Sequence, residues 1–220
     1  MPLVAPHPGF PTARVLAHPV VADVLTRLRE HHTPTAEFRR HMAVLAKALG
    51  LASTLDLEAA TRPIRTPLEE MEAPALPQPA PAIVAVLRAG LALSDHLVDL
   101  MPDAVLGQVG LRRDPETLEA VSYLTALPNL AGRPVLVCDP MLATGGSLVR
   151  TLQEVVDHGA AAAAIRVLTV IAAPEGLARV AEAFPQVVVY TCAVDSRLDE
   201  NAYIRPGLGD AGDRYFGTPH

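Results

Sequence analysis

The sequence contains few of the residues from which large interaction surfaces are built. It has no tryptophan, only four phenylalanines and four tyrosines, and a single lysine, Lys47. The formal net charge is −6, from 24 acidic and 18 basic residues. An acidic chain with few aromatic side chains offers little to a nucleic-acid backbone or to stacked bases, so we exclude a nucleic-acid partner. Because Lys47 lies between two alanines, a lysine-containing P-loop is excluded as well.

Long hydrophobic runs are also missing. The longest, residues 160–173, is interrupted by Arg166 and Thr169 and is shorter than the roughly 18 residues that a membrane span needs. The proline-rich N-terminus has no basic start and no long apolar segment, so it is not a secretion signal. Cys138 and Cys192, the two cysteines, lie inside apolar runs typical of buried thiols. We therefore expect no membrane association and a cytoplasmic location.

The residues that are present predict a globular protein. Half of the 220 residues are hydrophobic and the mean hydropathy is +0.27, which is enough for a substantial core. Residues 1–13 are expected to form a flexible tail, and residues 14–220 a single domain. Residues 18–51 show a helical pattern, with Thr33 as the expected N-cap and Pro34 as the first helical residue. The residues expected on the buried face of this helix are Phe38, Met42, Leu45 and Leu49.

From Ile83 onward, short strand-like runs alternate with longer helical segments. The expected strands cover residues 83–87, 104–111, 135–138, 166–172 and 187–192, and the expected helices residues 91–100, 146–158 and 174–184. This alternation predicts an α/β fold, a parallel twisted sheet with helices on both faces. Ligands of such sheets bind beyond the carboxyl ends of the strands, so the turns after Leu87, Cys138 and Cys192 are candidate sites.

Three other segments do not follow this rhythm. The stretch that ends at Arg65 fits neither a helix nor a strand clearly. Residues 76–81 contain three prolines and are expected to be a stiff connector. The chain from Asp195 onward reads as a glycine-rich loop, in which Asp195, Asp199 and Glu200 form an acidic cluster that we interpret as structural.

The turn after Cys138 carries the strongest chemical signal. Asp139 ends a strand, and Thr144, Gly145, Gly146 and Ser147 begin the next helix. Two glycines let the backbone approach a ligand, while hydroxyl groups, free amides and the positive end of the helix attract an anion. A phosphate would repel the carboxylate, whose natural partners are hydroxyl groups. A phosphorylated sugar meets both demands, whereas two glycines alone would indicate only a tight turn.

The string DPMLATGGS, residues 139–147, resembles the phosphoribosyl-diphosphate (PRPP) loop of phosphoribosyltransferases, in the form typical of the uracil-specific branch. Four further segments resemble that family: LRAGL at 87–91, RDPETLE at 113–119, AAPEG at 172–176 and YIRPGLGDAGD at 203–213. They correspond to its pyrophosphate loop, its flexible arm, the start of a helix and its base-binding loop. The resemblance extends over about residues 15–218, which is nearly the whole chain.

The resemblance implies a role for individual residues. Arg88 and Arg113 would bind pyrophosphate, Asp139 the ribose hydroxyls, and the arm, residues 112–127, would close over the substrate. The complete set implied for PRPP is Arg88, Arg113, Asp139, Pro140, Met141, Leu142, Ala143, Thr144, Gly145, Gly146, Ser147 and Asp210. The set implied for uracil is Ile204, Gly209, Asp210 and Ala211. The residues taken as catalytic are Asp139, Arg88, Arg113 and Asp210. Mg²⁺ would be held mainly by PRPP, and a cis peptide is expected at Leu87–Arg88.

The expected activity is therefore transfer of the phosphoribosyl group of PRPP to uracil, giving UMP and pyrophosphate. Two alternatives remain: a phosphoribosyltransferase specific for another base, and a non-enzymatic regulator that senses PRPP or UMP. Outside the family context, Arg88 could instead pair with Asp95 or Asp139, and Tyr203 could be a core residue. The resemblance also implies a homo-oligomer and, in some relatives, activation by GTP.

Overall fold

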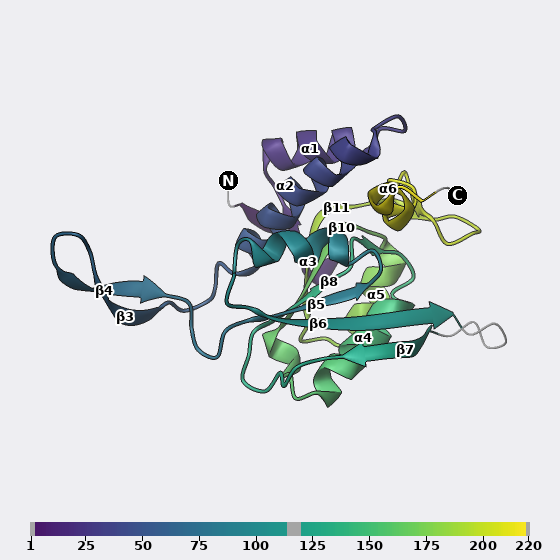
Figure 1. Cartoon of the computed structure of the whole chain (residues 1–220). Helices are drawn as coiled ribbons and strands as arrows, with labels where there is room; N and C mark the ends of the chain where they lie inside the picture. Colours follow the sequence, from purple (N-terminus) through teal and green to yellow (C-terminus); the bar gives the residue numbers. More distant parts are fainter. Residues whose placement is uncertain (1–2, 114–119, 219–220) are drawn as a thin grey trace.

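The computed structural model describes residues 3–113 and 120–218 (Figure 1). Its main feature is a nine-stranded sheet whose strands follow the order β1-β2-β11-β10-β8-β5-β6-β7, with β9 paired to β10. The strands between β2 and β6 pair in parallel, whereas β1 and β7 at the two edges are antiparallel to their neighbours. The bounds are β1 Val4–His7, β2 Phe10–Leu16, β5 Ala82–Leu87, β6 Val105–Arg113, β7 Ala120–Ala126, β8 Val135–Cys138, β9 Met141–Leu142, β10 Ile165–Ala172 and β11 Val188–Val194.

Helices cover both faces of this sheet, as Figure 1 shows. On one face lie α1 (Pro19–Arg29), α2 (Thr35–Ser53) and α3 (Leu91–Val98), and on the other α4 (Gly146–Asp157) and α5 (Pro174–Ala183). Each layer has its own hydrophobic core, because successive strand residues point to opposite faces. In β8, for example, Leu136 packs with the first layer and Val137 with the second. The predicted α/β fold is confirmed, including the buried face formed by Phe38, Met42, Leu45 and Leu49.

The N-terminal tail is a wrong prediction. β1 and β2 form an antiparallel hairpin, and β2 joins the main sheet in parallel with β11 through the pair Ala13 and Val189. The expected boundary at residue 13 thus falls inside β2. Proline-rich sequence argues against a central strand, but Pro6 lies in the edge strand β1, where the lost amide hydrogen bond faces outward. Ala13 itself is completely buried.

Smaller differences concern the ends of elements. α2 begins at Thr35 with Pro34 in the N-cap position, and the hydroxyl of Thr33 donates to the carbonyl of Arg27 instead of capping α2. The C-terminal segment is not only loop: it contains β12 (Arg197–Leu198), β13 (Ile204–Arg205) and the short helix α6 (Ala211–Phe216). Both cysteines are free and buried, and burial raises the pKa of each thiol, most strongly that of Cys138.

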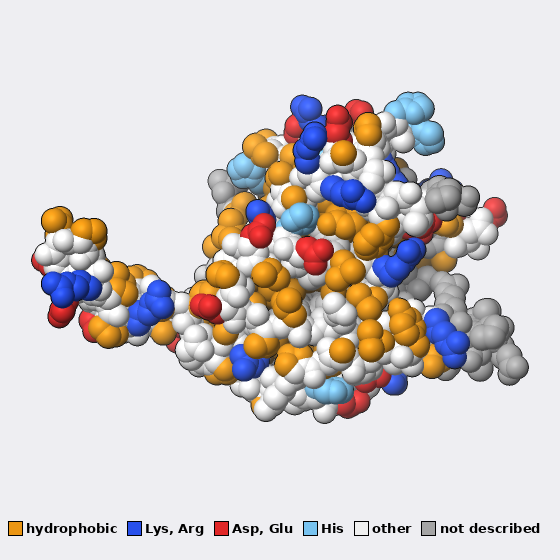
Figure 2. Space-filling model, in the orientation of Figure 1, with side chains coloured by type: hydrophobic (Ala, Val, Ile, Leu, Met, Phe, Trp, Pro, Cys, Tyr) orange, Lys and Arg blue, Asp and Glu red, His pale blue; other side chains and the backbone are white. Residues whose placement is uncertain are grey.

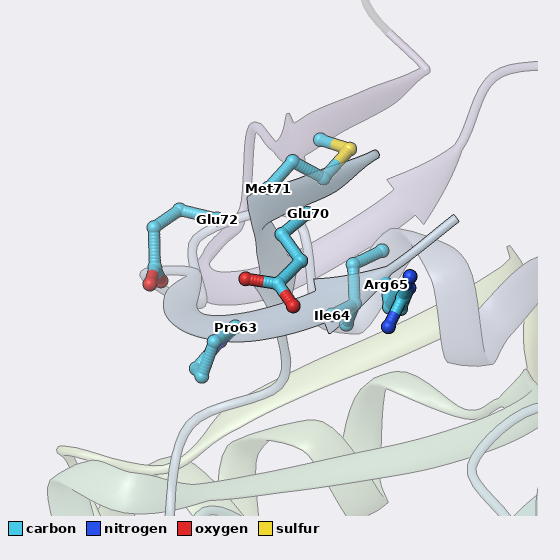
Figure 3. A pocket seen from close by; sticks show the side chains of 6 residues that line it. All are labelled: Pro63, Ile64, Arg65, Glu70, Met71 and Glu72. Atoms are coloured by element: carbon cyan, nitrogen blue, oxygen red, sulfur yellow. The ribbon is translucent and has the colours of Figure 1, made fainter. Parts of the chain in front are cut away.

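The ambiguous stretch before the connector forms a separate two-stranded hairpin of β3 (Ala60–Arg65) and β4 (Glu70–Ala75). It projects from the body of the molecule (Figures 1 and 2). An open hollow of about 480 Å³ lies on this hairpin, and Figure 3 shows the side chains from both strands that line it. The hollow lies away from the carboxyl ends of the sheet strands, where ligands of α/β folds bind. In the described part of the chain, no helix is long and apolar enough to cross a membrane.

Candidate functional site

The parallel register of the sheet brings the candidate turns together. Ala85 of β5 lies beside Cys138 of β8, and Cys138 lies beside Leu168 of β10. The chain leaves β5 at Leu87 and β8 at Cys138 on the same edge of the sheet, and β11 ends at the same edge. The loops that follow these strands form the candidate site.

The turn after β8 has the geometry of an anion-binding loop. Gly145 has a φ of 77°, a left-handed conformation that favours glycine, and α4 begins at the next residue. A Cβ at Gly145 would also lie 3.0 Å from the carbonyl oxygen of Gly176 in α5. The amides at the start of α4 are thus free to face a ligand.

A cavity of about 140 Å³ lies at this turn. Six of the residues expected to bind PRPP line it, together with Leu148 and Ala202; they are Asp139, Met141, Ala143, Thr144, Gly145 and Ser147. Pro140 and Leu142 have a different place. The carbonyl of Pro140 accepts the amide of Val170 at 2.9 Å, and the carbonyl of Leu142 accepts the amide of Ala173 at 2.8 Å. These two residues therefore anchor the loop to the strand and helix behind it.

Asp139 is the acidic group of this cavity. Burial raises the pKa of its carboxyl from 3.8 to about 7, and the amide of Met141, 3.4 Å from Oδ1, opposes that rise only weakly. No arginine or lysine ion pair of Asp139 occurs among the described residues. The carboxylate therefore has acceptor capacity left for hydroxyl groups of a ligand.

Arg88 lies at the turn after β5. The Leu87–Arg88 peptide bond is cis, as expected. The guanidinium lies 3.6 Å from Asp213 Oδ1 and 5.4 Å from the centre of the Phe216 ring, so the alternative pairing with Asp95 or Asp139 is wrong. A side chain at Gly90 would collide with backbone of β5 and with the carbonyl of Cys138 at 2.3 Å, which explains the glycine after Arg88. More than half of the Arg88 side chain, 59%, remains exposed.

A second cavity, of about 270 Å³, lies against the C-terminal loop. Among its lining residues are Ile204, Gly209 and Asp210, three of the four residues expected to bind uracil. The fourth, Ala211, is fully buried in the first turn of α6 and does not line the cavity. Tyr203 also lines the cavity and is 48% exposed, so it is not a core residue.

Asp210 has a structural partner in addition to its place at the cavity. It is the N-cap of α6, where its Oδ1 accepts the amide of Asp213 at 2.8 Å. An N-cap carboxylate of this kind fixes the start of a helix. One of its oxygens is thereby engaged within the protein, and the expected contact with PRPP or its metal would use the other.

The arm is described only at its base. β6 and β7 form an antiparallel pair that reaches Arg113 and Ala120, with a register shift next to Gly110. Arg112 is exposed on β6. The side chain of Arg113, the candidate pyrophosphate contact, and the segment 114–119 lie outside the described residues, so the closing of the arm stays a prediction.

Sequence reasoning missed the contacts that hold the C-terminal loop in place. The buried carboxylate of Asp195 pairs with Arg29 of α1 and accepts the amide of Gly207 at 2.9 Å. Asp199 accepts the amides of Tyr203 and Asn201, and these bonds together with Arg205 lower its pKa. Asp195 and Asp199 of the acidic cluster contribute to loop structure, as interpreted. Nothing in the sequence singled out Arg29, because its partner follows 166 residues later.

Comparisons with known proteins agree with this geometry. A family model described as uracil phosphoribosyltransferase matches residues 15–218. The chain is 44% identical over 212 residues to a protein of Rhodospirillum centenum, covering 96% of this chain and 98% of the relative. It is 47% identical over 205 residues to a protein of Paracoccus denitrificans, covering 93% and 96% of the two chains. Both relatives are named uracil phosphoribosyltransferase.

Solved structures show the same fold. The AQ2163 protein from Aquifex aeolicus is 34% identical and superposes with a TM-score of 0.87, over 94% of this chain and 98% of that one. An APRTase from Giardia lamblia, complexed with 9-deazaadenine, is 14% identical and has a TM-score of 0.51, over 79% and 84% of the two chains. This second likeness concerns the fold alone.

Proposed function

The chain belongs to the uracil phosphoribosyltransferase family, and we propose that it transfers the phosphoribosyl group of PRPP to uracil. One observation carries this proposal: the cavity at the phosphate loop and the cavity at the C-terminal loop share the lining residues Met141, Ala143 and Ala202. The two cavities therefore adjoin. A phosphate in one and a base in the other would be joined by a ribose placed between them, which is the arrangement of a nucleotide.

The roles follow from the surroundings of each group. The amides and hydroxyls of residues 143–147 hold the 5′-phosphate at the start of α4. Asp139 accepts hydrogen bonds from the ribose hydroxyls, and Arg88 and Arg113 bind the pyrophosphate with forked guanidinium contacts. Backbone groups of the C-terminal loop, from Ile204 to Ala211, meet the edge of uracil, whose N3–H lies between two carbonyl groups.

In the reaction, the bond between ribose C1 and the pyrophosphate oxygen breaks and a bond between C1 and uracil N1 forms. The N1 proton is released, and the pyrophosphate leaves with the electron pair of the broken bond. Positive charge develops on the ribose in the transition state, so the enzyme acts mainly by positioning the two substrates and stabilising charge. Residues 139–147 fix the ribose from the phosphate side, while the C-terminal loop fixes the base on the other.

Magnesium fits this site as an ion carried mainly by the substrate. Among the described residues, no group of three or more His, Cys, Asp or Glu side chains could form a protein cage for a metal. Asp139 and the Asp210 oxygen that does not cap α6 would supply hard oxygen ligands for Mg²⁺, alongside phosphate oxygens of the substrate. When bound, the ion would neutralise charge on the leaving pyrophosphate.

The hairpin β3–β4 supports the proposal of a homo-oligomer. It is a separate sheet of two strands, and such a hairpin is marginally stable in water unless it packs against another surface. Leu68 at its turn is 95% exposed and Met71 is 44% exposed. Figure 2 shows hydrophobic side chains along this projection. A second copy of the chain would cover them. Activation by GTP and a cytoplasmic location stay predictions.

The proposed activity is tested by turnover of uracil with PRPP and Mg²⁺, followed as UMP formation, with cytosine, orotate, adenine and hypoxanthine as competing bases. We expect UMP to form and the other bases to be poor substrates. Turnover of another base in preference to uracil would favour the enzyme of different specificity. Binding of UMP without any turnover, together with retention on RNA at moderate salt, would favour a regulator.

A further inference from the structure

A buried ion pair connects the end of α1 to the residue that follows β11. Arg29 is the last residue of α1, and its two terminal nitrogens lie 2.8 Å and 2.5 Å from the two carboxylate oxygens of Asp195. Only 8% of Asp195 is exposed. Burial makes such a pair a weak contributor to stability, because both charges lose their hydration. Its two-pronged geometry instead fixes the position of whatever else the pair contacts.

The pair contacts both polar groups of one backbone residue, Gly207. The amide of Gly207 donates to Asp195 at 2.9 Å, and its carbonyl accepts from Arg29 at 2.7 Å. Gly207 has a φ of 71°, and a Cβ there would lie 2.1 Å from the carbonyl oxygen of Ile204. The chain is thus folded back tightly at this point, and the ion pair holds the fold. The next two residues, Leu208 and Gly209, line the cavity assigned to the base.

A second arginine holds the neighbouring carbonyl. Arg214 of α6 donates to the carbonyl of Leu208 at 2.7 Å and, with its other terminal nitrogen, to the carbonyl of Glu30 at 2.7 Å. Its guanidinium lies 4.5 Å from the centre of the Phe38 ring. The end of α1 therefore holds two successive residues of the loop, one through Arg29 and one through Arg214.

We infer that the Arg29–Asp195 pair positions the base-binding loop and thereby sets the affinity for the pyrimidine base, without touching the base itself. The amide and carbonyl of Gly207 and the carbonyl of Leu208 are hydrogen-bonded inside the protein, which fixes their positions. Gly209 and Asp210, which follow these held residues, line the base cavity together with Ile204, so their placement depends on the residues before them. This inference rests on the proposed function, which assigns the loop to uracil.

The test compares substitutions in two ion pairs, each of which includes an arginine of α1. Arg29→Lys keeps the charge opposite Asp195 but cannot contact both carboxylate oxygens and the Gly207 carbonyl at once, and Asp195→Asn removes the charge. The matched controls are Arg27→Lys and Asp23→Asn, which alter an exposed ion pair one turn apart on α1, with both side chains 61% exposed. We expect Arg29→Lys to raise the KM for uracil about tenfold, because small displacements of a binding group are costly. The KM for PRPP should change less than twofold, and the controls should match the wild type.

Binding measurements distinguish positioning from general damage. Calorimetry with UMP and with ribose 5-phosphate compares ligands with and without the base. If the pair positions the loop, Arg29→Lys weakens the binding of UMP but not that of ribose 5-phosphate. Equal weakening of the binding of both ligands would overturn the inference, and so would an unchanged KM for uracil in a folded Arg29→Lys protein. If Asp195→Asn does not fold, Arg29→Lys decides the matter by itself.

A third variant separates this inference from the proposed function. Gly209 has a φ of 78°, so Gly209→Ala strains the loop at the cavity itself. If Gly209→Ala raises the KM for uracil and Arg29→Lys does not, the positioning role of the Arg29–Asp195 pair is refuted, while the assignment of the loop to uracil is supported. If neither variant changes uracil kinetics, the assignment of the loop to uracil fails as well.

Discussion

Asp139→Asn should change stability and activity in opposite directions. Burial raises the pKa of the Asp139 carboxyl from 3.8 to about 7, so folding favours its protonated form. Below pH 3.8 the carboxyl is protonated in both the folded and the unfolded protein, so its burial carries no charge penalty. Between pH 3.8 and about 7 only the folded protein keeps the proton, and the free energy of unfolding falls as the pH rises through this range. At pH 8 the folded protein therefore carries a destabilising carboxylate. Asparagine has nearly the same shape and stays neutral, so it does not carry this cost.

The size of the effect follows from the pKa. A rise of about three units corresponds to about 4 kcal/mol at pH 8, at about 1.4 kcal/mol per unit. The carboxylate faces a cavity open to solvent, which screens part of this cost, so we expect Asp139→Asn to raise the free energy of unfolding by about 2 kcal/mol at pH 8. The melting temperature should rise by about 5 °C in a chain of this length. The difference should shrink toward zero as the pH falls toward 4.

The assay is urea unfolding of the ligand-free protein across this pH range, combined with kinetics. The same variant loses a charged acceptor for the ribose hydroxyls, so its kcat/KM for PRPP should fall about 100-fold. In the wild type, kcat/KM for PRPP should rise with pH up to about 7 and then level, and in Asp139→Asn this dependence should vanish. An Asp139→Asn protein that is less stable than the wild type at pH 8 would refute the reasoning, since the carboxylate would then be stabilised by its surroundings.

Three further predictions concern the phosphate loop, the pyrophosphate site and the hairpin. Gly145→Ala forces a side chain into a left-handed turn and to 3.0 Å from the Gly176 carbonyl, so the KM for PRPP should rise about tenfold while the KM for uracil stays within twofold. Arg88→Ala should leave the melting temperature nearly unchanged, because Arg88 is largely exposed and its ion pair with Asp213 is long, yet lower kcat/KM for PRPP about 100-fold. Leu68→Glu places a charge on the exposed turn of the hairpin, and light scattering should show a shift to smaller assemblies with an unchanged far-ultraviolet spectrum.

The central part of the fold could be predicted because its strands are buried on both faces. Residues 83–87 are continuously apolar and residues 167–172 contain one polar residue, Thr169, which is typical of buried parallel strands. The turn after Cys138 was predictable for a related reason. A strand followed by an acidic residue, two glycines and the start of a helix is typical of an anion-binding turn. In both cases the information lies within about fifteen adjacent residues, so local reasoning was sufficient.

The elements that were missed depend on distant partners. The strand β2 contains Pro11, which argues against a strand, and its place in the sheet is decided by β11 almost 180 residues later. The hairpin β3–β4 contains Pro63 and Pro74 and pairs only with itself, so no buried face gives it an alternating pattern. Arg29 and Asp195 meet only because α1 packs beside β11.

The contacts of the C-terminal loop explain why its cations are arginines and not lysines. Arg29 bonds two carboxylate oxygens and a backbone carbonyl, and Arg214 bonds two carbonyls while its flat face covers the Phe38 ring. An ammonium group has neither the fork nor the flat face, so a lysine could not make either set of contacts. Arg88, in contrast, keeps more than half of its side chain exposed beside the candidate site. Arginine thus has two roles in this protein: it bonds the backbone of the loop, and it offers an exposed charge to an anionic ligand. These few cations are enough for an acidic chain to bind a small phosphorylated substrate.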